Sequence, residues 1–66
     1  MWSENLQKQT VEHFKKLPMA AMKQVGGRFG FCIYKNGQYV IKNMSNNQQY
    51  IFDTIDDLIA AKWAID

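Results

Sequence analysis

The dipeptide Asn36-Gly37 lies between two runs rich in β-forming residues, 29–34 and 39–41. An Asn-Gly pair in this setting favours a two-residue type I′ turn, because both turn positions need a positive φ. Such a turn fixes the pairing register and places Tyr34 opposite Tyr39. The chain therefore predicts a β-hairpin whose two side-chain faces can be assigned residue by residue.

A second turn is expected in the Asn-rich segment 43–48, since Asn tolerates positive φ better than most residues. With Asn46-Asn47 as a two-residue turn, Ile41 pairs with Phe52 and Asn43 with Tyr50. The three strands then form an antiparallel β-meander.

Both faces of this meander carry large apolar groups, because side chains alternate along each strand. One face carries Phe29, Phe31, Ile33, Val40, Met44 and Ile51, with Lys35, Gln38, Lys42 and Gln49 between them. The other carries Cys32, Tyr34, Tyr39, Ile41, Tyr50 and Phe52. Two arrangements remain open: one helix covers each face, or both helices cover one face and leave the other bare.

The segment before the sheet predicts a helix that begins near Ser3, a good N-cap residue, and is kinked or split at Pro18. Its apolar side chains recur at helical spacing. Residues 19–25 then continue as a bent helix or form a second short one, and Gly26-Gly27 supply a C-terminal stop.

A C-terminal helix is expected after Asp53-Thr54, either of which can cap it, and should run to about Ala64 or Ile65. Its apolar stripe comprises Ile55, Leu58, Ile59 and Trp63. The order of elements predicts one small α+β domain over residues 1–66.

Composition narrows the class of protein. The chain has 66 residues, 47% of them apolar, one cysteine and a net charge of +2. It contains no apolar run of membrane-spanning length and no visible signal peptide, so we expect a cytoplasmic protein. The size is typical of the small accessory proteins of bacteria and their viruses.

Candidate catalytic groups lack partners in the sequence. His13 is expected on a helix flank and Cys32 within a strand, and neither has a neighbour that would tune it. The carboxylates of residues 53–57 suit a helix start better than a metal site. The glycines of residues 26–30 precede a strand, whereas a phosphate loop precedes a helix. We therefore expect no enzyme, no cofactor and no metal.

Two binding functions remain. The first is an interaction module that binds another protein, or itself as a homodimer, through a helix face or the aromatic sheet face of Tyr34, Tyr39 and Tyr50. The alternative is a nucleic-acid-binding regulatory protein that uses basic residues, although a charge of +2 is small for that role. Those residues are Lys8, Lys15, Lys16, Arg28 and Lys35.

Overall fold

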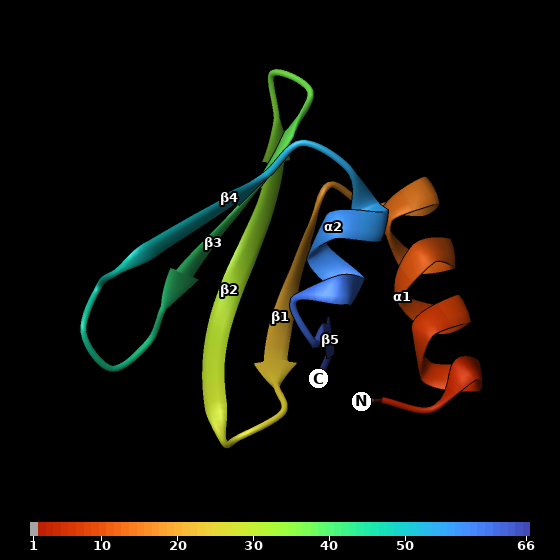
Figure 1. Cartoon of the computed structure of the whole chain (residues 1–66). Coiled ribbons are helices and arrows are strands. Elements are labelled where there is room, and N and C mark those ends of the chain that lie inside the picture. The colour runs from red at the N-terminus through yellow and green to blue at the C-terminus, as the bar shows by residue number, and fades with distance from the viewer. Residues whose placement is uncertain (1) are drawn as a thin grey trace.

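The main feature of the computed structural model is a five-stranded antiparallel sheet in the order β4-β3-β2-β1-β5 (Figure 1). The structure describes residues 2–66. The elements are α1 (Glu4–Lys16), β1 (Met19–Gln24), β2 (Arg28–Lys35), β3 (Gln38–Asn43), β4 (Gln49–Phe52), α2 (Ile55–Ala60) and β5 (Trp63–Ile65). The α+β class and the N-terminal helix are confirmed. The predicted three-stranded meander is only the β2-β3-β4 part of the sheet.

Helix α1 begins and ends where the sequence predicts. The side chain of Ser3 accepts a hydrogen bond from the N–H of Leu6 (3.2 Å), which makes Ser3 the N-cap. At the other end, the N–H of Leu17 donates to the carbonyl of His13 (2.9 Å), and Pro18 follows. The helix ends there and does not continue past Pro18 as a bent helix.

Residues 19–25, predicted as a helix, instead contain strand β1. Ala20 and Met22 are buried while the residue between them is exposed, which is the period-two pattern of a strand. β1 pairs with β2 on one side and β5 on the other, and this pairing outweighs the helix propensity of Ala and Met. Gly26 and Gly27, at φ of 109° and 92°, form the turn into β2 rather than a helix stop.

The β2-β3 hairpin is confirmed in both turn and register. Asn36 and Gly37 have φ of 52° and 77°, the positive values that the turn requires. Tyr34 lies opposite Tyr39 as predicted.

The turn between β3 and β4 is not the predicted Asn46-Asn47 pair but a longer loop. Ile41 lies opposite Tyr50 rather than Phe52, so the predicted register is wrong by two residues. A shift of two keeps every side chain on its own face, because strand side chains alternate with a period of two. The predicted division into two faces is therefore retained.

Helix α2 is shorter than predicted and ends at Ala60. Thr54 is its N-cap, which confirms one of the two candidates. Lys62 adopts a φ of 72°, and this left-handed residue redirects the chain into β5. Trp63 therefore enters the core from a strand that pairs with β1, not from a helix.

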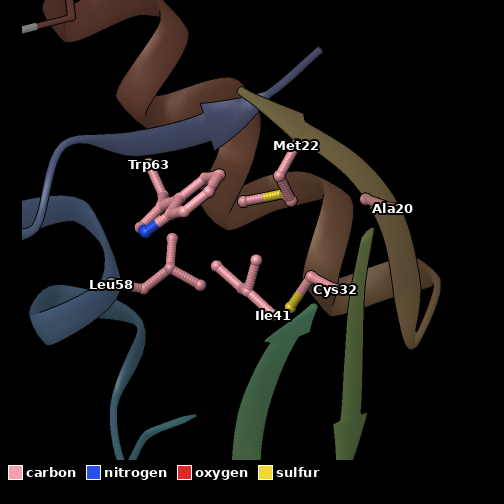
Figure 2. Packing of buried hydrophobic residues seen from close by; sticks show 6 residues of the cluster. All are labelled: Ala20, Met22, Cys32, Ile41, Leu58 and Trp63. Atoms are coloured by element: carbon pink, nitrogen blue, oxygen red, sulfur yellow. The ribbon is translucent and has the colours of Figure 1, made fainter. Parts of the chain in front are cut away.

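Both helices cover the same face of the sheet. Figure 2 shows Trp63 and Leu58 beside Ile41 and Met22. Phe14 of α1 packs against the same cluster. The fully buried members of the cluster are Met22, Cys32, Ile41, Leu58 and Trp63, with Ala20 nearly so. Within residues 2–66, the opposite face of the sheet carries no helix.

The two buried polar residues are both hydrogen-bonded. Thr10 Oγ1 donates to the carbonyl of Leu6 (2.9 Å) and accepts the N–H of Ile65 (3.2 Å). That second bond satisfies an outward-facing N–H of β5, which would otherwise be an unpaired donor at a sheet edge. Asn43 Oδ1 accepts the N–H of Ser45 (2.7 Å) and holds the β3-β4 loop.

Candidate functional site

The sheet face away from the helices, called the open face below, carries most of the exposed large apolar side chains in the part of the chain that the structure describes. Its two aromatic side chains, Phe29 and Phe31, are 52% and 38% exposed. Ile51 is 57% and Met44 70% exposed. The apolar residues of the open face are Met19, Phe29, Phe31, Ile33, Val40, Met44 and Ile51. A surface of this kind usually marks an interaction site.

Cross-strand pairing organises the open face into rows. One row is aliphatic and runs across four strands through Met19, Ile33, Val40 and Ile51. The next row places Lys42 of β3 beside Phe31 of β2. Opposite side chains of an antiparallel pair have Cβ atoms about 5 Å apart, so each row is continuous.

A third row pairs Phe29 with Lys23 of β1. The ammonium of Lys23 also lies 5.0 Å from the centre of the Trp2 ring, within the range of a cation–π contact. Phe29 and Phe31 are two residues apart on β2, about 7 Å along the strand. The two rings therefore stand side by side, each with a lysine on the neighbouring strand.

The charge on the open face has one sign over the strands. Within residues 2–66, no strand residue is an Asp or Glu. Lys23, Lys35 and Lys42 all have open-face positions. Two acidic residues lie at the rim: Asp53 accepts a hydrogen bond from Gln38 (3.0 Å), and the N–H of Asp66, the residue after β5, donates to the carbonyl of Ala21 (2.9 Å).

The predicted partner-binding tyrosines lie on the opposite, helix-covered face. The rings of Tyr34 and Tyr39 are 4.6 Å apart between centroids, and Phe14 meets Tyr39 edge-on at 5.3 Å. Tyr50 packs against Trp63 at 5.7 Å. Burial, followed by the neighbouring Tyr34 and the Cys32 thiol, raises the pKa of Tyr39. Tyr39 and Tyr50 are half-buried, whereas Tyr34 remains 41% exposed.

The five basic residues proposed for nucleic acid do not form one surface. Lys8, Lys15 and Lys16 lie on α1, and Lys15 pairs with Glu12 at 3.2 Å. Arg28 and Lys35 lie at opposite ends of β2 on alternate faces, so only Lys35 belongs to the open face.

Each residue considered for catalysis has a structural role in the fold. The Nε2–H of His13 donates to the carbonyl of Met19 (2.8 Å) and links α1 to β1. Cys32 is fully buried, and burial raises the pKa of its thiol to about 12. Such a thiol is not a nucleophile at neutral pH. Asp57 lies in the first turn of α2, and its backbone N–H donates to the hydroxyl of the N-cap residue Thr54 (3.1 Å).

A groove of about 690 Å³ lies between α1 and α2. Its lining combines two apolar residues with carboxylates of both helices, one lysine and one glutamine. Its lining residues are Glu4, Gln7, Lys8, Val11, Glu12, Asp56 and Ile59. Across residues 2–66, no group of three His, Cys, Asp or Glu side chains is placed to hold a metal ion.

Sequence reasoning missed two residues of the open face, Met19 and Lys23, because it assigned their segment to a helix. The usable signal was the Gly26-Gly27 pair, which suits a hairpin turn between two strands as well as a helix end.

Comparison of the chain with protein families, with curated proteins and with solved structures finds no match. In residues 2–66, no helix combines the length and the apolar character needed to cross a membrane.

Proposed function

We propose that this protein is a non-enzymatic interaction module and that its binding surface is the open face of the sheet. One observation carries the proposal: both helices pack on the tyrosine face, so no helix covers the large apolar side chains opposite within residues 2–66, and most of them remain exposed. The binding surface expected from the sequence, Tyr34, Tyr39 and Tyr50, thereby becomes the less favoured one.

The geometry of the open face suits a macromolecule rather than a small substrate. Its exposed groups are spread over four strands and form rows, whereas a small-molecule site is concave. Exposed Phe and Met are enriched at the centres of protein interfaces. The buried free thiol of Cys32 supports a reducing, cytoplasmic setting for such a module.

Position-specific photo-crosslinking in the cells that make the protein tests this proposal without assuming a partner. The photoreactive residue p-benzoylphenylalanine replaces Phe31 in one variant and Tyr34 in the other. These side chains are nearly equally exposed, 38% and 41%, but they lie on opposite faces.

We expect adducts of higher mass from position 31 and few from position 34. Adducts from position 34 alone would return the binding surface to the tyrosine face. If irradiation gives no adduct at either position, the proposed module is wrong.

A further inference from the structure

We infer that the occupant of the open face is a single-stranded nucleic acid, stacked on Phe29 and Phe31 and neutralised by Lys23 and Lys42. This inference rests on the proposed function, because it names the partner of the same surface. It differs from the lysine set expected from the sequence, which lay mostly on α1.

The first support is the spacing of the two rings. Phe29 and Phe31 project from the same face of β2, are 52% and 38% exposed, and stand about 7 Å apart along the strand. Aromatic side chains on an open sheet surface can stack successive unpaired bases. Stacking tolerates any base, because every base has a π-face.

The second support is the charge around the rings. Lys42 is the cross-strand neighbour of Phe31, and Lys23 is that of Phe29. Gln49, the next residue in the row of Lys42, adds a neutral polar group. Within residues 2–66 the strands contribute no carboxylate to this surface, and Asp53 and Asp66 lie just beyond the ends of β4 and β5. The attraction for a polyanion is therefore concentrated at the lysines beside the two rings.

The same charge argues against a second copy of the chain as the occupant. A two-fold dimer brings the same patch of both copies together. Its interface would bring the three lysines of one face toward those of the other, while the nearby carboxylates of Asp53 and Asp66 lie beyond the strand ends at the rim. A single-stranded nucleic acid avoids this repulsion, because its phosphate groups are opposite in charge to the lysines.

Duplex DNA is the less suitable ligand. The open face offers rings for stacking, and paired bases inside a duplex do not expose their π-faces. The structure therefore predicts a preference for single strands over duplexes of the same length.

The test measures the anisotropy of a fluorescein-labelled oligothymidylate of about 12 nucleotides as protein is added at about 50 mM salt. We expect saturable binding that weakens with salt, with a log–log slope of roughly −1.4 for the two phosphate contacts of Lys23 and Lys42. A labelled duplex of the same length should bind more weakly.

Two matched pairs of variants locate the surface. Phe31→Ala should weaken binding by roughly 5- to 150-fold, the range for loss of one stacked base, whereas Tyr34→Ala should leave it unchanged. Lys42→Gln should reduce the magnitude of the salt slope by about 0.7, whereas Lys8→Gln on α1 should not. All four residues are exposed, and circular dichroism checks that each variant is folded.

Four results would overturn the inference. The first is no binding of the oligothymidylate at low salt. The second is a loss of affinity in the Tyr34→Ala variant equal to that in Phe31→Ala. The third is face-to-face self-association, seen as sedimentation that rises with concentration and is abolished by Phe31→Ala. That third result would leave the open face as a binding surface and assign it to a second copy. Crosslinking at position 31 to protein alone would likewise remove the nucleic acid and retain the module.

Discussion

Replacing Trp63 tests whether the short C-terminal strand anchors the core. Trp63 is 1% exposed and packs with Met22, Ile41 and Leu58. Truncation of a buried aromatic to alanine costs about 3–5 kcal/mol. A domain of this length has a total stability of roughly 3–10 kcal/mol. Trp63→Ala therefore removes a large part of the stability and should lower the melting temperature by at least about 12 °C.

Trp63→Phe is the matched control. The indole Nε1–H of Trp63 is the one buried side-chain polar atom in residues 2–66 that has no hydrogen-bond partner. Phenylalanine keeps a six-membered aromatic ring and removes the unpaired donor together with the smaller ring of the indole, so it leaves a smaller cavity than alanine and its loss of stability should be well below that of alanine.

Urea unfolding followed by far-ultraviolet circular dichroism measures both variants without relying on the fluorescence of the residue that is changed. The account predicts the order wild type, Trp63→Phe, Trp63→Ala in unfolding midpoint. An unfolding midpoint of Trp63→Ala at nearly the urea concentration of wild type would refute this expectation, as would a phenylalanine variant that loses as much stability as alanine.

Three further predictions concern single positions. Gly30→Ala should lower the free energy of unfolding by about 1–3 kcal/mol, because the new Cβ would lie 2.8 Å from Ile41 Cγ2 and 2.9 Å from the carbonyl oxygen of Lys42. An unchanged thermal melt would show that β2 and β3 are further apart. Lys62→Gly should raise the free energy of unfolding by about 0.5–1 kcal/mol. Glycine removes the backbone strain of a side chain at φ 72°, and this gain exceeds the extra conformational entropy that glycine gives the unfolded chain. A loss of stability would contradict this. Burial raises the pKa of Cys32 from 9.0 to about 12, so the thiol of the unfolded chain loses its proton at a lower pH than that of the folded chain. The free energy of unfolding should therefore fall between pH 9 and pH 12, by at most about 1.4 kcal/mol per pH unit. Cys32→Ala should show a shallower decline in urea unfolding between pH 8 and pH 10, and equal slopes would refute the assignment.

The parts of the fold that sequence predicts correctly are those set by local chemistry. Ser3 caps α1, Pro18 ends it, and Asn36-Gly37 fixes the central hairpin. Each depends on one or two residues with a strong backbone preference, so neighbours distant in the chain do not alter the outcome.

The parts that fail depend on partners distant in sequence. The segment of β1 has the composition of a helix, yet it forms an internal strand of the sheet because β2 and β5 pair with its two edges. β5 has only three residues, and its pairing to β1 joins segments about 40 residues apart in the chain. Periodicity within a short window contains no information about either pairing.

The candidate site follows the same division. Alternation along β2 and β3 correctly assigns Phe29, Phe31 and Lys42 to one face. Which face the helices cover depends on the paths of α1 and α2, and the sequence left both arrangements open. The structure resolves that choice and moves the proposed binding surface from the tyrosines to the phenylalanines.

Methyl nuclear magnetic resonance during titration with single-stranded oligothymidylate tests the central claim most directly, because the chain carries suitable probes on both faces. Ile33, Ile51 and Met44 report on the open face, and Ile41 and Leu58 on the buried core. The account predicts that the open-face methyl signals shift in proportion to bound oligonucleotide while the core signals stay in place. Shifts confined to Val11 and Ile59, in the groove between α1 and α2, would contradict it.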